Sequence, residues 1–325
     1  MTLPIFTSLN EIVSACPTYI AQSGYHVMYS SIFSGIVTDP KLMTIPVDDH
    51  LVHRGDGVFE AFKMIDGKVF LFDAHLSRLE RSATAISLSL KHSNSEIKGI
   101  CKQLIEVCGL KNALFRLYAS RGPGGFTPNP YASIGPQLYI IVSDLNNPAE
   151  TLYENGAKVG FSQIAVKSGG LAQVKTCNYI SNVLMTKEAV DQGLNYMINV
   201  TDDGFLGEGP TENLAYLTAE NDLVFSSFDH TLRGTTLLRL QELSSNLVEK
   251  GLIREMKEAK QLASELCAAK EAFMIGTTID ALPVVEVAGK LIGDGMPGAV
   301  SKAARELLKH DQLENGTVLL DCQDL

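Results

Sequence analysis

A short segment rich in asparagine and proline, Leu145–Glu150, separates two halves of the sequence, and the pattern of strands and helices restarts beyond it. Asn and Pro favour connections over the interiors of helices or strands. In both halves, β-rich runs are grouped apart from the helical stretches, which favours an α+β fold over alternating βαβ units. We therefore predict a smaller N-terminal α+β domain at 1–143, a linker at 144–150 and a larger C-terminal domain at 151–325.

The first half contains a strong hairpin signal. Two β-rich runs, 58–65 and 68–72, are joined by Asp66-Gly67, a pair typical of two-residue hairpin turns. Two further runs, 114–120 and 137–143, flank a loop rich in Gly and Pro. These runs predict short strands.

Two amphipathic helices are expected in the same half. Asp73 precedes an apolar stripe of helical spacing and is predicted to cap the first helix, with Arg78 near the exposed edge of that stripe. Ser95 is predicted to open the second helix and Gly109 to stop it. The second half is expected to contain strands at 158–166, 195–201 and 272–275, helices at 182–192, 236–250, 262–269 and 300–310, and a hairpin at 284–292.

Composition excludes several classes of protein. The 325 residues are 45% hydrophobic and 20% charged, as in folded globular proteins. A net charge of −10 argues against a nucleic-acid partner, because a phosphate backbone needs a basic face. The six cysteines lack the spacing of a disulfide framework or zinc site. We expect no metal.

The N-terminus indicates neither secretion nor a membrane anchor. It lacks a basic segment followed by an apolar core, so we expect no signal peptide. Residues 12–38 contain no Asp, Glu, Lys or Arg. However, Pro17, Gly24, Gly35 and several polar side chains interrupt this segment too often for a helix that spans a bilayer. We interpret it as a lead-in plus buried strand, and we predict a cytoplasmic protein.

Three features could bind phosphate. Arginine binds phosphate with two hydrogen bonds, although Arg78 alone also fits a solvated helix residue. Leu232–Thr236 places Gly and Thr at a predicted helix start, where free N–H groups bind anions, although an ordinary helix cap explains it too. Gly276–Thr278 follows a predicted strand and also suits a plain turn. Together, outside any nucleotide-binding motif, they suggest a phosphorylated cofactor.

The sequence resembles the fold-type IV pyridoxal-phosphate family, from roughly Pro46 to Leu308. This family comprises branched-chain aminotransferases, D-amino-acid aminotransferases and aminodeoxychorismate lyases. Six motifs occur in the family's order, which is far more specific than any one of them: Arg54–Glu60, Asp73–Leu79, Val174–Tyr179, Gly207–Asn213, Gly234–Thr236 and Gly276–Thr278.

The resemblance implies roles for three catalytic residues. Lys175 is identified as the lysine that holds pyridoxal 5'-phosphate as a Schiff base and then acts as general base and acid. Glu208 matches the carboxylate that keeps the pyridine nitrogen protonated, and Tyr179 the tyrosine that hydrogen-bonds the phenolate oxygen. Without the resemblance, these residues would be a surface lysine, a turn residue and a core tyrosine.

The resemblance also implies a phosphate site and an oligomer. Arg78, Thr236 and Thr277 match the side-chain phosphate ligands, while Thr235 and Thr278 match positions that contribute main-chain N–H groups. The family forms homodimers in which the partner completes the substrate site, and we expect the same here.

Departures from the family's patterns bear on the reaction and the substrate. Well-known D-amino-acid aminotransferases have tyrosine at Phe59 and an Arg-x-His loop that this chain lacks. Branched-chain enzymes have tyrosine at Arg54 and alanine at Thr278. Asn178 and Tyr179, which the lyases usually lack, indicate transamination. The combination is most similar to plant-type D-amino-acid transaminases, so the expected substrates are a D-amino acid, or a branched-chain L-amino acid, and a 2-oxo acid.

The substrate site is expected to contain Arg54, Phe59, Arg121 and Thr278. Arg54 is the candidate for the α-carboxylate, since it lies in the opening strand motif, although a pairing with Asp49 or Asp56 would explain it equally well. Two other functions stay open: a lyase that eliminates pyruvate, and a non-catalytic protein that binds pyridoxal phosphate.

Overall fold

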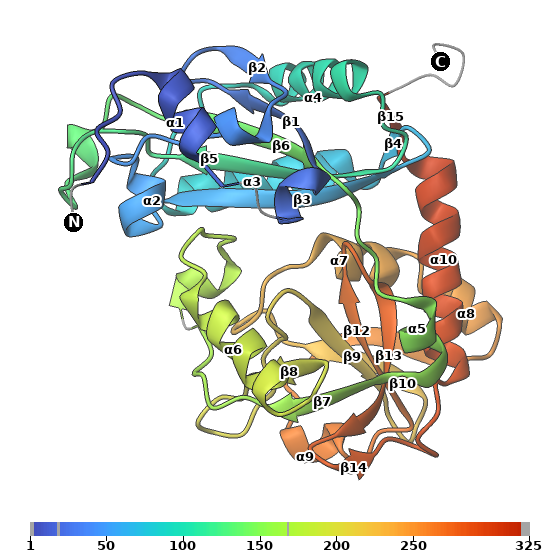
Figure 1. Ribbon diagram of the computed structural model, residues 1–325. Coiled ribbons are helices and arrows are strands. Elements are labelled where there is room, and N and C mark those ends of the chain that lie inside the picture. Colours follow the sequence, from blue (N-terminus) through green and yellow to red (C-terminus); the bar gives the residue numbers. More distant parts are fainter. Residues whose placement is uncertain (1–2, 18–19, 168, 320–325) are drawn as a thin grey trace.

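The computed structural model describes residues 3–17, 20–167 and 169–319, which form two β-sheets with their associated helices (Figure 1). Helices and strands occur in separate groups, which confirms the predicted α+β class. Within these ranges, no helix is both long enough and apolar enough to cross a membrane.

The first sheet has the strand order β15-β4-β3-β5-β6-β1-β2. Helices α3 and α4 cover one face, and a core that includes Phe62, Leu76 and Leu104 fills the space between them. Alternate residues of β3, such as Phe59 and Ala61, belong to the opposite face. The strands are β1 (Tyr25–Ser30), β2 (Gly35–Val37), β3 (Gly57–Ile65), β4 (Lys68–Val69), β5 (Ala113–Ser120), β6 (Gln137–Ser143) and β15 (Thr317–Val318).

The hairpin is formed where the sequence predicts it. Strands β3 and β4 pair with Met64 opposite Val69, and the turn residues Asp66 and Gly67 have φ values of +49° and +77°, as a type I′ turn requires. The second strand ends early, because Phe72 begins helix α3 instead of extending β4. The uncharged N-terminal segment contains the expected strand, β1.

The helix starts differ from the predicted ones. Helix α3 (Phe72–Ala85) follows Leu71, whose φ is +54°, so the prediction that Asp73 caps it is wrong. Asp73 lies in the first turn, where a carboxylate interacts favourably with the positive end of the helix dipole. It forms an ion pair with Lys98 at 2.6 Å. Helix α4 (Asn94–Cys108) is capped by Ser93 rather than Ser95, and ends at Gly109 as predicted.

The inner strands β9, β10 and β13 of the second sheet are buried on both faces and are rich in hydrophobic residues. The strand order of this sheet is β11-β10-β9-β12-β13-β7-β8, with β14 paired to β13. Helices α7 and α10 pack on one face. The strands are β7 (Ala157–Phe161), β8 (Tyr196–Ile198), β9 (Asn213–Leu217), β10 (Asp222–Ser226), β11 (Glu255–Ala259), β12 (Glu271–Gly276), β13 (Asp280–Val287) and β14 (Lys290–Leu291).

The single helix predicted at 236–250 is wrong, because the chain breaks at Leu243–Ser244 into α7 and α8. Periodicity alone does not reveal such a break, since both segments bury residues on the same side. Apart from α3 and α4, the α-helices are α1 (Leu9–Ala15), α2 (His50–Arg54), α5 (Glu150–Asn155), α6 (Ile180–Asp191), α7 (Thr235–Glu242), α8 (Ser245–Glu249), α9 (Ala263–Leu266) and α10 (Ala299–Asn315).

Besides the connection at residues 144–149, the contacts that join the two halves include a strand pairing and an ion pair. Strand β15, which follows α10, pairs with β4, so the end of the described chain returns to the first sheet (Figure 1). Lys63 of β3 and Asp280 of β13 form a buried ion pair at 2.6 Å. The domain boundaries expected from the sequence stay a prediction.

Candidate active site

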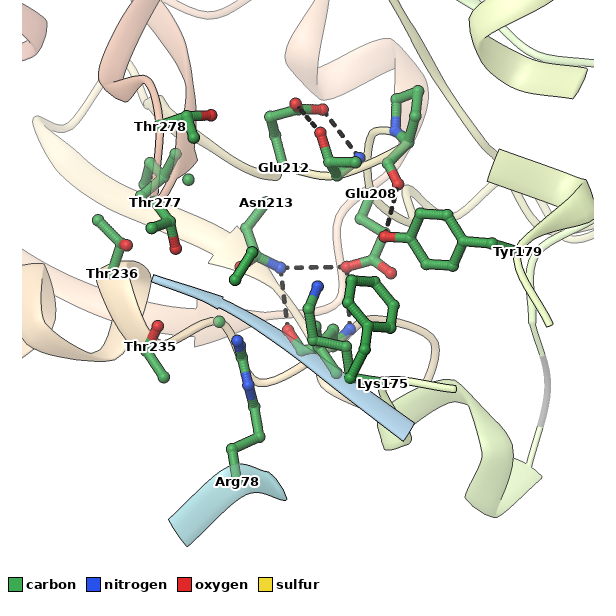
Figure 2. Close-up of a pocket in the computed structure, with 18 of the residues that line it drawn as sticks. Arg78, Lys175, Tyr179, Glu208, Glu212, Asn213, Thr235, Thr236, Thr277 and Thr278 are labelled. Carbon is green, nitrogen blue, oxygen red and sulfur yellow. Dashed lines mark hydrogen bonds between the residues drawn. The ribbon is translucent and has the colours of Figure 1, made fainter. Parts of the chain in front are cut away.

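A pocket of about 240 Å³ lies where β3 and β5 of the first sheet face the second sheet. Figure 2 shows Lys175 between two groups of side chains: Arg78 and several threonines on one side, Glu208 and Tyr179 on the other. The structure brings together most of the residues that the sequence predicts for the site. These are Phe59, Arg78, Lys175, Tyr179, Glu208, Thr235, Thr236, Thr277 and Thr278.

Lys175 is held from two elements and points into the pocket. Its main-chain N–H donates to Ser82 Oγ of α3 at 3.3 Å, and its carbonyl accepts from the Phe59 N–H of β3 at 3.0 Å. The amine lies 4.4 Å from the centroid of the Phe59 ring. Desolvation, reinforced by the charge of Arg78, lowers the pKa of Lys175 to about 8. The amine can therefore lose its proton near neutral pH.

Arg78 is buried, so its interpretation as a solvated helix residue is wrong. Its Nε and Nη2 donate to the two carboxylate oxygens of Glu60, both at 2.7 Å, and its Nη1 donates to the carbonyl of Arg233 at 3.3 Å. Burial alone would raise the pKa of Glu60, but the charge and hydrogen bonds of Arg78 outweigh it and lower that pKa to about 2. A fully ionised Glu60 thus fixes the guanidinium at the edge of the pocket.

His75 extends this buried network. Its Nδ1 lies 2.7 Å from Glu60 and its Nε2 3.3 Å from the hydroxyl of Thr235. Burial lowers the pKa of His75, despite the opposing effect of Glu60. The Thr235 hydroxyl therefore faces the network, and the role of its main-chain N–H as a phosphate donor stays a prediction.

The start of α7 and the turn after β12 form the remaining wall of this end of the pocket. Gly234 is the N-cap of α7, and a Cβ at that position would lie only 1.9 Å from Asn213 Oδ1. Glycine is therefore required for the close approach of the two segments. Thr236 follows in the first turn, where main-chain N–H groups and the helix dipole favour an anion. Thr277 lies across from it (Figure 2).

Glu208 and Tyr179 mark the opposite end. Glu208 Oε2 accepts hydrogen bonds from the Leu232 N–H at 2.9 Å and from Asn213 Nδ2 at 3.2 Å. Burial raises the pKa of Glu208 to about 7, so a cation beside it would favour its ionised form. The Tyr179 hydroxyl donates to the Pro210 carbonyl at 3.2 Å, and its ring packs edge-on against Phe59.

The two arginines predicted to bind substrate lie elsewhere in this chain. Arg54 is exposed in helix α2, not in a strand, and donates to the carbonyls of His53 and Phe126 at 2.8 and 3.1 Å. The alternative pairing of Arg54 with Asp49 or Asp56 is wrong, because Asp56 forms an ion pair with Arg121 at 2.9 Å and Asp49 accepts hydrogen bonds from the hydroxyls of Ser120 and Tyr139. Among the described residues, neither Arg54 nor Arg121 lines the pocket.

Sequence reasoning missed three residues of the site. Arg116 of β5 lines the pocket opposite Ala61, and strand alternation could have revealed it, because Phe115 and Leu117 point into the core. Asn213 is the last residue of the Gly207–Asn213 motif. Its Nδ2 donates to Glu208 Oε2 and, at 3.0 Å, to the Leu232 carbonyl. Glu60 gives no signal of its own, since its role depends on the packing of α3 against β3.

The donor set suits one kind of molecule. Cationic and N–H donors gather at one end, an acidic carboxylate lies at the other, and an amine of lowered pKa stands between them. Phosphate, a pyridine nitrogen and an aldehyde are the groups of pyridoxal 5'-phosphate that these donors match. The residues present therefore fit this cofactor.

Similarity to known proteins agrees with this geometry. A model of the family described as amino-transferase class IV matches residues 57–287. The chain is 38% identical to a chloroplastic D-amino-acid transaminase of Arabidopsis thaliana, over 87% of this chain and 76% of that protein. It is 26% identical to a D-alanine aminotransferase of Bacillus licheniformis, over 87% of this chain and 96% of that protein.

A solved structure shows the same fold. A hypothetical aminotransferase from Mycobacterium tuberculosis, solved in its PLP-bound form, superposes with a TM-score of 0.75 at 22% identity, over 89% of this chain and 99% of that one. The family match spans well over half of the sequence and contains Lys175, Glu208 and the other pocket motifs except part of the first. The chain therefore belongs to the class IV aminotransferase family.

Proposed function

We propose that Lys175 holds the pyridoxal 5'-phosphate of this class IV aminotransferase, and that the enzyme transfers an amino group from a D-amino acid to a 2-oxo acid. The observation that carries this proposal is the Lys175 amine, with its pKa lowered to about 8, placed between an anion site and Glu208. The choice of D-amino acids rests on the 38% identity to the Arabidopsis D-amino-acid transaminase.

When bound, the cofactor supplies an aldehyde that condenses with amines and a ring that accepts the electrons of the broken Cα–H bond. Arg78, the first turn of α7 and Thr277 bind the phosphate. Glu208 keeps the pyridine nitrogen protonated through its carboxylate. The freed Lys175 amine moves the proton to and from Cα as general base and acid.

Tyr179 and Phe59 position the reacting groups. The two rings meet edge-on with centroids 5.2 Å apart, and Lys175 Nζ lies against both. Apolar ring surface excludes water from the amine and keeps its pKa low. With the cofactor bound, the Tyr179 hydroxyl would turn its one hydrogen from the Pro210 carbonyl to the phenolate oxygen. An intact lysine, carboxylate and tyrosine of this kind support a catalyst rather than a non-catalytic binding protein.

We assign the substrate carboxylate to Arg116. This guanidinium lines the pocket from β5, and its Nη1 donates to Ser143 Oγ at 2.6 Å, which fixes the side chain. Arginine binds a carboxylate through two parallel N–H groups and so orients Cα for Lys175. Arg121 is unsuitable because its N–H groups are engaged by Asp56 and by main-chain carbonyls.

The variant Arg116→Gln tests this assignment. We expect KM for amino acid and oxo acid alike to rise about tenfold to a hundredfold, because a charge-assisted hydrogen bond contributes roughly 1.5–3 kcal/mol. Cofactor affinity should not change. Arg254→Gln, a change on an exposed side chain, is the matched control. A normal KM in Arg116→Gln and a raised one in Arg54→Gln would transfer the role to Arg54, supplied by a second subunit.

The proposal extends to a homodimer in the cytoplasm. Large apolar side chains of α6 are exposed on the second half, among them Ile180, Val183 and Val190. Exposed apolar groups of this kind support an interface between copies of the chain. The cytoplasmic location is a proposal only, and the Arabidopsis relative is named as chloroplastic.

Spectra of half-reactions, in a screen of D- and L-amino acids against pyruvate and 2-oxoglutarate, test the function. We expect D-amino acids alone to convert the bound cofactor to its amine form, and either oxo acid to restore it. Conversion by branched-chain L-amino acids only would correct the substrate class. Release of pyruvate from an amino acid other than alanine, in excess over the enzyme and without an added oxo acid, would instead identify a lyase, and an unchanged spectrum would identify a binding protein.

A further inference from the structure

A second lysine lies against the same groups as Lys175. Lys167 Nζ is 5.0 Å from the centroid of the Tyr179 ring, closer than Lys175 Nζ at 5.9 Å. Lys167 is not among the residues that line the main pocket in the described part of the chain. It approaches Glu208 from a separate cavity.

This separate cavity adjoins Glu208. Its volume is about 10 Å³, enough for a single water molecule. Polar atoms without a hydrogen-bond partner among the described residues belong to two of its lining side chains, Asn182 Oδ1 and His230 Nδ1. Asn182 is only 7% exposed. Buried polar atoms need partners, so the cavity is built for a polar or charged group.

Glu208 separates the cavity from the main pocket, because it lines both. Its Oε2 is already held by Leu232 and Asn213. The charged groups that interact with it include Lys167, Lys175, Glu212 and Arg78. The two lysines oppose the effects of burial and of Glu212 on its pKa. Of the two lysines, Lys167 lowers the pKa of Glu208 more than Lys175 does. In return, Glu208 counteracts the lowering of the Lys167 pKa by burial.

Burial raises the pKa of the Tyr179 hydroxyl, and the negative charges of Glu208, Glu212 and Glu60 add to this effect, while Arg78 opposes it. The ammonium of Lys167 over the ring face is attracted by the ring quadrupole, which holds the aromatic plane that packs against Phe59. Lys167 therefore contacts the ring and opposes the accumulated negative charge.

We propose that Lys167 is a positioning residue of the aminotransferase reaction, which keeps Glu208 ionised beside the pyridine nitrogen and holds the Tyr179 ring in place. The inference rests on the proposed function. It assigns to Lys167 an electrostatic role that needs a positive charge, not a particular shape, so arginine can replace it and methionine cannot.

The test compares Lys167→Met with Lys167→Arg and with the control Lys187→Met. Lys187 is an exposed lysine of α6 that pairs with Asp191. The readout is the pH midpoint of the absorbance of the bound cofactor. Loss of a nearby positive charge raises the pKa of every neighbouring group, so Lys167→Met should shift this midpoint upward by about one unit. The arginine variant and the control should keep the wild-type midpoint.

Two further measurements separate the possible outcomes. Borohydride reduction and peptide mapping must place the cofactor label on Lys175 in wild-type protein, and a label elsewhere would refute the proposed function itself. If the label is on Lys175 and the midpoint of Lys167→Met is unchanged, the role of Lys167 is refuted. A lowered melting temperature of the cofactor-free protein with an unchanged midpoint would identify a structural lysine only. Lys167→Gln gives a second comparison if the methionine variant does not fold.

Discussion

Replacing Lys175 by methionine is expected to lower kcat for transamination by at least about 10³-fold, since the variant loses its general base as well as the amine that holds the cofactor. Methionine has a similar length and suits the buried surroundings of Phe59 and Ser82, so the fold should persist. Rates of the half-reaction with a D-amino acid, measured at saturating cofactor, give the comparison.

Lys187→Met is again the matched control. Its side chain is exposed and pairs with Asp191 one helical turn away, so its rate should equal that of the wild type. Mapping after borohydride reduction gives an independent result, with the pyridoxyl label on Lys175 alone. A label on Lys167 or Lys187 would contradict the assignment, and so would a Lys175→Met variant that retains its rate.

The second large effect is expected for Arg78→Ala, which should weaken cofactor binding by about one to two decades. A charge-assisted hydrogen bond to phosphate contributes roughly 1.5–3 kcal/mol. The same variant leaves Glu60 buried without its partner, and breaking a buried pair costs about 3–5 kcal/mol of folding stability. Fluorescence titration with pyridoxal phosphate measures the first effect, and urea unfolding of the cofactor-free protein the second.

The variant Arg78→Met combined with Glu60→Leu separates these effects. Removing both charges should restore much of the lost stability, but not the cofactor affinity. Acid provides a further check, because the folded pKa of Glu60 is depressed to about 2 from 4.5. Its contribution to stability is present above pH 4.5 and is lost as the pH falls toward 2. Unchanged affinity in Arg78→Ala would remove Arg78 from the phosphate site.

The sequence correctly predicted the turns and helix ends that depend only on neighbouring residues. Asp66-Gly67 specifies its turn through backbone geometry alone, and Gly109 ends α4 in the left-handed conformation that glycine adopts easily. Helix α3 begins instead after Leu71, whose φ of +54° is unusual for a residue other than glycine and is not indicated by its side chain. Asp73 therefore has the right chemistry for a cap, but it lies inside the first turn.

The active-site residues likewise fall into those that a local motif identifies and those that depend on contacts between elements. Motifs placed Lys175 and Glu208 correctly in one pocket, because each motif carries its residue with it. The surroundings of Arg78 depend on Glu60 from another element, which periodicity does not reveal. Arg54 was assigned to a strand although it ends the short helix α2, whereas Arg116 of β5 lines the pocket.

Strand β15 has a consequence for how this polypeptide could be divided. Because it pairs with β4, a first half produced alone, ending at residue 143, would lack an edge strand and expose the unpaired backbone of β4. Cleavage of the connection at 144–149 would leave the two pieces bound through β15 and the Lys63–Asp280 pair. Phe70 of the first half also belongs to the core of the second, while Val174 and Leu319 belong to the core of the first. The two halves are thus not autonomous as fragments, and shortening the chain before Thr317 removes part of the first sheet.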